Sequence, residues 1–521
     1  MAVSSPSPRI RLWWLWLIIF ALLAYSLPMA VTALRLGTIA PDNDDGFIYL
    51  TYIREATAGN FFQYNALNRG EYTAGMTSLL WYLIQIPLAL AIKLLTTNPN
   101  LAVLLTMHIT SAFCLAGVFL LLFKLTKLKS ESWLLATIAV LALATGSFFM
   151  WGIYSGLENP LASLLLMAMV YLLLTRSDLK GSILSGLFAG LLTLTRPETV
   201  AISLGFGLVW LGNELLAKRR SHKKELFPVR GIKHVLVFLG ATLAIYLCGA
   251  LVYFLVTGVP NPSSYGSRFF IQLSSIHPYP LLFSSIRVFF QNGPFSFIPL
   301  ALLILAPFTK RELRMPVIWL VTAIMVRCLV GLYSWYFYRY LTWSTPVIIF
   351  SVLVSLPLFI DLKPIKRKLQ ILLPIAITLF LMIYYYPMCR SGFYDTVKEI
   401  QQTTVAAGEW IAENTPPDAI IASEPMGAVG FYCQRETVDI MGLTTKETWG
   451  TFGNWDFTFR YMRERGVSYL LYYQLPAPYD SYVIPVKDFY ADRNILVPSD
   501  HLTLYKINWE LYDQTTQSPD N

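Results

Sequence analysis

The sequence predicts a polytopic α-helical membrane protein with a small α/β domain at its C-terminal end. Hydrophobic residues make up 55% of the 521 residues, and charged residues only 14%. Apolar blocks of about 17 to 25 residues recur along the chain, which is the length that crosses a bilayer as a helix. Because lipid offers no hydrogen-bond partners, every backbone amide in such a block must be paired internally, as it is in a helix.

Short basic loops between the apolar blocks predict the orientation. They lie at residues 9–11, 124–129, 176–180, 218–233, 310–314 and 363–368. The positive-inside rule places all of these loops in the cytoplasm. The net charge of +9 is explained by this topology. A nucleic-acid partner is therefore not needed to account for the charge, and none is expected.

With those loops inside, the apolar blocks predict about eleven transmembrane helices. The predicted spans are residues 12–34, 101–123, 131–150, 158–175, 181–195, 199–217, 234–257, 294–309, 315–333, 341–360 and 371–387. The apolar stretch 78–95 is left out, because counting it would move the basic loop 124–129 outside. We expect it to lie along the outer leaflet or dip into it. An odd number of crossings then places the first loop, residues 35–100, and the chain after Pro387 outside.

The chain changes in character after about residue 391. TTVAAGEWIAENTP and FTFRYMRERG have helical periodicity, and DAIIAS, ETVDIMG and VSYLLYY are short β-rich runs. Alternating helices and strands predict a small α/β domain. The expected organisation is a transmembrane module at residues 1–390 and an extracytoplasmic α/β domain at 391–521. This domain either binds a polymer, through aromatic residues such as Trp449, Trp455 and Tyr479, or braces the loops.

Three carboxylates, those of Asp42, Asp44 and Asp45, follow the first predicted span in the stretch PDNDDGFIYLTYI. One interpretation is catalytic: a carboxylate at the mouth of a cleft deprotonates a hydroxyl or, as part of the cluster, holds a divalent cation. The other is structural, since Asp is a favoured N-cap and a helix-like segment follows at once. A cap needs only one carboxylate, so the surplus favours function.

Several other polar segments map to the same predicted outer face, and six segments on one leaflet are typical of the rim of one site. The substrate-binding candidates in them and in the span 315–333 are Glu71, Thr77, Glu158, Arg196, Glu198, Tyr265, Arg268, Arg327 and Arg339. Arg196 and Glu198 flank a proline and could instead pair with each other at a turn. Arg339 lies among interfacial aromatics, where a snorkelling arginine is equally expected. Arg327 lies inside a predicted span and must face a partner or a cavity.

Segments along nearly the whole chain resemble those of GT-C-fold glycosyltransferases. In order they are DDGFIYLTYIREATAGN, GMTSLLW, SGLENPL, LLTLTRPE, PNPSSYGSR, RYLTWSTP, WIAENTPPDAIIASEPMGAVGFY and VDIMGLT. They most resemble the polyprenyl-phosphate-sugar-dependent branch that includes the mycobacterial terminal arabinofuranosyltransferases. The resemblance implies an acidic catalytic residue in the first outer loop. By position this role falls on Asp44, with Asp45 beside it.

The resemblance therefore predicts a hexosyl- or pentosyltransferase that takes a sugar from a polyprenyl-phosphate donor in the bilayer. The acceptor is a glycan, a lipid or a protein outside the cytoplasmic (inner) membrane of a bacterium. The sequence identifies no cofactor with certainty, and a divalent cation held by Asp42, Asp44 and Asp45 would serve the leaving phosphate, so metal dependence is left open. The alternative is a transporter or flippase for a lipid-linked or anionic substrate, which often shows internal repeats and broken midplane helices. The sequence shows neither feature.

Overall fold

The computed structural model describes residues 8–68, 71–219, 228–262, 313–330, 340–356, 392–496 and 499–516. The predicted spans 294–309 and 371–387 lie outside these residues, so the count of about eleven spans remains a prediction. Of the other expectations, Tyr265, Arg268 and Arg339 also lie outside the described residues. Arg327 falls within a described helix, but its side chain is not among those described.

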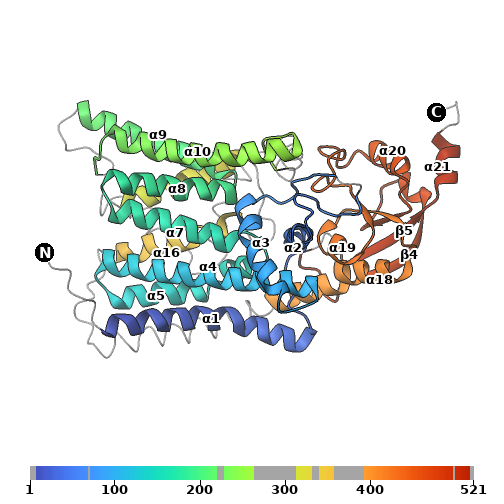
Figure 1. The fold of residues 1–521 in the computed structure, drawn as a ribbon, viewed down its shortest axis with the longest axis horizontal. Coiled ribbons are helices and arrows are strands. Elements are labelled where there is room, and N and C mark those ends of the chain that lie inside the picture. Colours follow the sequence, from blue (N-terminus) through green and yellow to red (C-terminus); the bar gives the residue numbers. More distant parts are fainter. Residues whose placement is uncertain are drawn as a thin grey trace.

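Long apolar helices form most of the chain before residue 357. Among the described residues, four helices are long and apolar enough to cross a membrane: α1 (Pro8–Leu36), α4 (Pro99–Ser130), α9 (Thr199–Arg219) and α10 (Ile232–Thr257). A bent pair, α5 (Trp133–Ala144) and α6 (Ser147–Tyr154), would make a fifth span. Shorter apolar helices accompany them: α7 (Asn159–Thr175), α8 (Leu179–Thr195), α14 (Arg314–Val330) and α16 (Thr345–Ser355). The long axes of most of these helices run side by side (Figure 1).

The expected surface helix is α3 (Leu79–Lys93), which has 15 residues. Its N-terminus is capped by the Ser78 hydroxyl, which accepts a hydrogen bond from the Trp81 N–H. Figure 1 shows α3 crossing the ends of the long helices rather than running parallel to them. At about 1.5 Å per residue, a helix of this length is too short to span a bilayer without help from its flanks.

The residues after 400 contain all strands of the mixed five-stranded sheet that the structure describes. The strands are β1 (Ile420–Ser423), β2 (Glu436–Asp439), β3 (Tyr469–Tyr472), β4 (Val483–Tyr490) and β5 (His501–Ile507), in the order β2-β1-β3-β5-β4. The pairs β2-β1 and β1-β3 are parallel, and the pairs β3-β5 and β5-β4 are antiparallel. The first three strands coincide with the three β-rich runs of the sequence.

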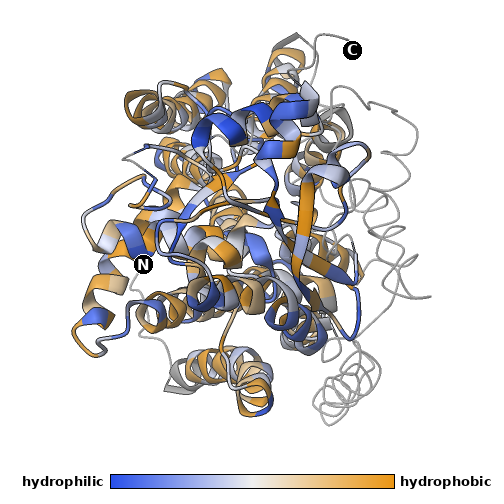
Figure 2. Cartoon of the chain, turned by 90° about the vertical axis from the view of Figure 1, so that its right-hand side faces the viewer, coloured by the Kyte–Doolittle hydropathy of each residue, from blue (hydrophilic) through white to orange (hydrophobic). Residues whose placement is uncertain are grey.

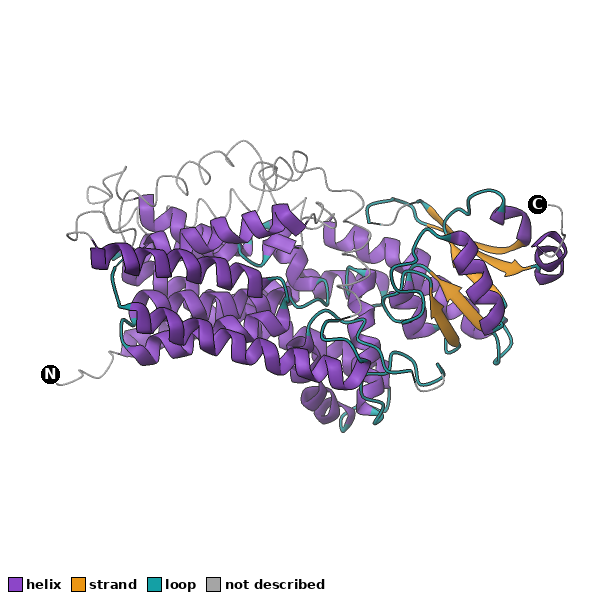
Figure 3. Cartoon of the chain, turned by 90° about the horizontal axis from the view of Figure 1, so that it is seen from above, coloured by secondary structure: helices purple, strands orange, loops and turns teal. Residues whose placement is uncertain are grey.

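Helices and turns cover this sheet on both faces. They are η5 (Gln401–Val405), α18 (Ala406–Asn414), α19 (Met426–Tyr432), α20 (Trp455–Arg465), η6 (Tyr479–Tyr482) and α21 (Trp509–Thr516). We call residues 392–516 the C-terminal domain. Figure 3 shows that the strands are confined to one end of the molecule, and Figure 2 shows hydrophilic segments of this domain in front of the largely hydrophobic helices.

Helix α2 (Asp44–Thr57) lies between the helical bundle and the C-terminal domain (Figure 1). Most of its residues are buried. The N-terminal end of α1 and the basic segments 124–129, which form the end of α4, and 176–180 lie at the opposite end of the bundle. The acidic stretch of the sequence and these two basic segments are thus separated by the full length of the helices.

Candidate functional site

Helix α2 begins immediately after Asn43, whose side chain accepts a hydrogen bond from the Asp45 N–H at 2.9 Å. Asn43 is therefore the N-cap, and neither Asp44 nor Asp45 is needed for that role. Both aspartates stand in the first turn, where a negative charge is favoured by the helix dipole. The N-cap that the sequence suggested for an aspartate is therefore Asn43.

The carboxylate of Asp44 binds the beginning of helix α19 in the C-terminal domain. Its two oxygens accept hydrogen bonds from the N–H groups of Gly427 and Ala428, each at 2.9 Å. Pro425, the N-cap of α19, supplies no side-chain cap. Asp44, which precedes Gly427 by 383 residues in the chain, therefore caps this helix instead. Burial raises the pKa of Asp44 to about 6; the hydrogen bonds from α19 oppose this rise, and the charge of Asp45 adds to it.

The neighbouring residue, Asp45, lies on a different face of α2, because consecutive helical residues are about 100° apart. Residues four apart share a face, so Asp45 lies above Tyr49. The Tyr49 hydroxyl donates a hydrogen bond to Glu158 at 3.0 Å. On the Asp44 side, the Phe47 ring lies 5.5 Å from the ring of Phe431 in α19. One face of α2 therefore contacts the C-terminal domain, and the other contacts the helical bundle.

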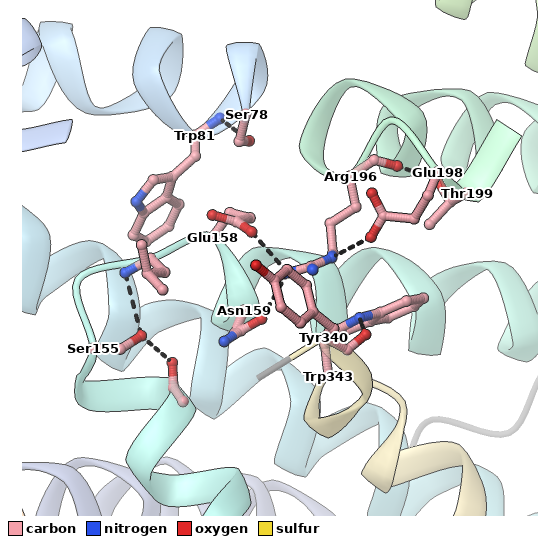
Figure 4. Close-up of polar contacts among 12 residues, drawn as sticks. Ser78, Trp81, Ser155, Glu158, Asn159, Arg196, Glu198, Thr199, Tyr340 and Trp343 are labelled. Carbon is pink, nitrogen blue, oxygen red and sulfur yellow. Dashed lines mark hydrogen bonds and ion pairs between the residues drawn. The ribbon is translucent and has the colours of Figure 1, made fainter. Parts of the chain in front are cut away.

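Glu158, Arg196 and Glu198 form one buried ion-pair network in that bundle (Figure 4). The Arg196 guanidinium lies 2.7 Å from the Glu158 carboxylate and 2.8 Å from that of Glu198, and it also donates to Asn159 Oδ1 at 3.1 Å. All three charged side chains are at most 6% exposed. The predicted Arg196–Glu198 pair at the turn after α8 is present, and a glutamate from the SGLEN segment joins it.

Aromatic rings and a loop complete the surroundings of this network. The guanidinium of Arg196 lies 5.4 Å from the centre of the Tyr340 ring and 5.9 Å from that of Trp343 (Figure 4). The Tyr49 hydroxyl also accepts the N–H of Ser78 at 2.8 Å. Segments from α2, the loop before α3, the SGLEN turn, the TRPE turn and the residues just before α16 therefore meet at this end of the bundle.

Close backbone contact joins α2 to the SGLEN turn. A methyl group in place of the Gly46 hydrogen would overlap with the carbonyl oxygen of Ser155, and one at Gly156 would approach Gly46 Cα. Only glycine permits this approach. The first turn of α2, which carries Asp45, is therefore fixed against the segment that carries Glu158.

The structure does not assemble the three aspartates into a metal site. Asp42 is completely buried, and neither of its oxygens has a hydrogen-bond partner; burial raises its pKa well above the ordinary value. Asp44 is bound by α19, and Asp45 lies on another face of α2. Within the described ranges, no group of three His, Cys, Asp or Glu side chains is arranged to hold a metal ion. The expected ligand set of Asp42, Asp44 and Asp45 thus gains no support from the described residues and stays a prediction.

The remaining described candidates are Glu71 and Thr77. Glu71 lies 2.5 Å from Arg465, which also pairs with Glu436 of β2 at 3.0 Å, so Glu71 connects the first loop to the C-terminal domain. Thr77 belongs to the loop before α3, and its carbonyl accepts a bond from the Tyr253 hydroxyl at 3.4 Å.

Sequence reasoning missed Tyr49, Asn159, Tyr340 and Trp343, all of which contact the network. For Tyr49 the signal was present, because it stands four residues after Asp45 on a predicted helix. It also missed Gly427 and Ala428, the partners of Asp44, for which no local pattern exists.

Comparison with known proteins supports the fold. A domain family described as a domain of unknown function (DUF8728) matches residues 395–517, and no curated protein matches the chain. The oligosaccharyltransferase AglB of Archaeoglobus fulgidus, solved with an inhibitory peptide and a dolichol-phosphate, aligns over 89% of this chain and 70% of its own, with 13% identity and a TM-score of 0.52.

ArnT of Cupriavidus metallidurans, solved with undecaprenyl phosphate, aligns over 95% of this chain and 98% of its own, with 12% identity and a TM-score of 0.56. At such identities the likeness shows the fold alone, and that fold is the GT-C fold of integral membrane proteins. The arabinofuranosyltransferase AftD from Mycobacteria aligns with a TM-score of only 0.41 and covers 42% of its own chain. An alignment with so low a TM-score does not favour the arabinofuranosyltransferase branch or any other branch of the fold.

Proposed function

We propose that this protein is a glycosyltransferase of the bacterial cytoplasmic membrane that moves a sugar from a polyprenyl-phosphate donor to an extracytoplasmic acceptor. The acceptor is a glycan, a lipid or a protein. One observation carries the proposal: in a GT-C fold, the face of α2 that carries Asp45 also carries Tyr49, which donates a hydrogen bond to Glu158 of the buried Glu158–Arg196–Glu198 network. In support, two proteins of similar fold were solved with dolichol-phosphate and undecaprenyl phosphate.

Of the two predicted catalytic carboxylates, we assign the base to Asp45. Both oxygens of Asp44 accept hydrogen bonds from α19, whereas Asp45 shares a face of α2 with Tyr49, which donates a hydrogen bond to Glu158 of the bundle. In the proposed reaction the acceptor oxygen attacks the anomeric carbon and forms the new glycosidic bond. The proton of the acceptor hydroxyl passes to Asp45, and the bond between the anomeric carbon and the phosphate oxygen breaks, its electron pair leaving with the phosphate.

Arg196 has a positioning role in this proposal. Among the described side chains, one guanidinium stands between two carboxylates, so the network offers no excess of positive charge to a phosphate. The leaving phosphate nevertheless needs cations for electrostatic stabilisation. Arg268, Arg327 and Arg339 remain the predicted phosphate contacts, since arginine binds phosphate through two parallel hydrogen bonds. The network itself holds the segments around Asp45 in place.

The test is sugar transfer by the purified protein in detergent. A panel of polyprenyl-phosphate sugars, each with a radiolabelled sugar, is offered with glycan, lipid and peptide acceptors, with and without a chelator. We expect labelled product from at least one donor and equimolar release of polyprenyl phosphate. The alternative is a transporter or flippase, which would move an intact donor across the bilayer of a proteoliposome without cleaving it. Donor movement without cleavage in that second assay would contradict the proposal.

A further inference from the structure

Helix α19 of the C-terminal domain lies against α2 at backbone distance. A methyl group at Gly427 would overlap with the carbonyl oxygen of Asp44, and one at Gly430 would overlap with the hydroxyl of Tyr64. Two glycines three residues apart thus present a bare helix surface to α2 and to the loop that follows it. Such an approach leaves no room for side-chain adjustment between the two helices.

Charged side chains bind both ends of α19. Asp44 accepts the first N–H groups of α19, as described above, and Arg54, near the other end of α2, donates to the Phe431 carbonyl at 2.6 Å. The guanidinium of Arg54 also lies 4.8 Å from the centre of the Phe431 ring. A carboxylate at the N-terminus and a guanidinium at the C-terminal carbonyls both suit the dipole of α19. Asp44 and Arg54 of α2 thus match the two ends of this one helix.

The loop after α2 adds further bonds to the same domain. The Tyr64 hydroxyl donates to the Met426 carbonyl at 2.5 Å. The Asn68 side chain donates to the Thr437 carbonyl at 2.9 Å and accepts the Thr437 N–H at 3.0 Å, which is how a neighbouring strand would pair with β2. These contacts hold the first loop and the C-terminal domain together as one unit.

Helix α2 has 14 residues, and a helix of that length is marginal in isolation, so its order depends on tertiary contacts. We infer that the C-terminal domain is a positioning element of the transfer site. Helix α19 packs closely against α2 at Gly427 and is hydrogen-bonded to Asp44 and Arg54. These contacts fix the orientation of α2 and therefore the position of Asp45. Asp44 is then a positioning residue rather than the base. The inference rests on the role proposed above for Asp45.

The other role considered for this domain, acceptor binding through Trp449, Trp455 and Tyr479, has weaker support. The Trp455 ring lies 4.9 Å from that of Tyr472 and 6.1 Å from that of Tyr479, within an aromatic cluster that covers the sheet. These rings stabilise the domain internally.

The experiment measures hydrogen exchange of residues 44–57 and transfer kinetics in the same full-length preparations. Gly427→Ala adds the overlapping methyl group, and Asp44→Ala removes the carboxylate without changing the C-terminal domain. Gly240→Ala is the matched control, because a methyl group there meets no atom within 4 Å. We expect both test variants to accelerate exchange in α2 by about tenfold or more and to lower kcat by about tenfold with little change in KM. The control should alter neither quantity.

Asp45→Ala separates positioning from chemistry. It should abolish transfer and leave exchange in α2 unchanged. If Asp44→Ala abolishes transfer while α2 exchanges as in the wild type, Asp44 acts chemically and the inference is overturned. Unchanged exchange in Gly427→Ala, with β1 and β3 still protected, would overturn it as well. If even the wild-type protein transfers no sugar, the proposed function fails, whereas faster exchange in the two test variants would still support the structural dependence of α2 on α19.

Discussion

Removing the guanidinium of Arg196 is expected to destabilise the protein strongly. Arg196→Met leaves two carboxylates, those of Glu158 and Glu198, at a site where each is about 5% exposed. Because water cannot replace the lost partner, breaking a buried pair in this way costs about 3 to 5 kcal/mol. Arg196→Lys keeps the charge but cannot bridge two carboxylates with a planar group, so its cost should be smaller.

The assay is thermal unfolding in detergent, followed by tryptophan fluorescence. We expect Arg196→Met to lower the midpoint by about 3 to 5 °C, because the unfolding entropy scales with the length of the chain. The triple variant Arg196→Met, Glu158→Gln, Glu198→Gln, which carries no buried charge at these positions, should regain most of that loss, because a neutral replacement of the whole network avoids unpaired charge. A single variant as stable as the wild type, or a triple variant no more stable than the single one, would refute the ion-pair network.

Three further predictions concern α2 and the C-terminal domain; the first and third use the same unfolding assay, and the second uses limited proteolysis. Gly46→Ala forces a methyl group into the Ser155 carbonyl and should cost about 1 to 3 kcal/mol; wild-type stability would contradict the close approach. Arg465→Ala breaks the pairs with Glu71 and Glu436, which are about one-fifth exposed or less. It should therefore release the C-terminal domain faster in limited proteolysis, whereas an unchanged rate would exclude a joining role. Burial raises the pKa of Glu424 to about 7, so the folded protein holds this proton more tightly than the unfolded chain does. Stability should fall by roughly 2 to 3 kcal/mol as pH rises from 5 to 8, and Glu424→Gln, which cannot ionise, should flatten that dependence.

The elements that follow from local patterns could be predicted from the sequence. Long apolar blocks became helices, because their length suits a bilayer and lipid leaves the backbone to pair internally. The three β-rich runs became β1, β2 and β3, because short runs of such residues favour strands. The Arg196–Glu198 pair also followed from a local feature, a proline-interrupted apolar run. Glu158 was placed at the same rim by orientation alone, because the positive-inside rule sorts loops by side of the membrane.

Contacts between segments far apart in the chain could not be predicted. The partners of Asp44 lie 383 and 384 residues away, and nothing in GAVGFY marks a helix that lacks its own cap. Arg465 likewise reads as the last-turn cation of an amphipathic helix, yet it pairs with Glu71 across the domain contact. The divergence of Asp44 and Asp45 has a local cause instead. Adjacent acids in a sequence look like one cluster, whereas consecutive residues of a helix point about 100° apart, and Asp42 precedes the helix.

The measurement that tests the central claim most directly is sugar transfer by wild type, Asp44→Asn and Asp45→Asn, with one donor that the wild type accepts. Our account predicts product from the wild type, no detectable product from Asp45→Asn, and reduced but measurable product from Asp44→Asn, whose amide oxygen can still accept one N–H from α19. Full activity of Asp45→Asn would contradict the account.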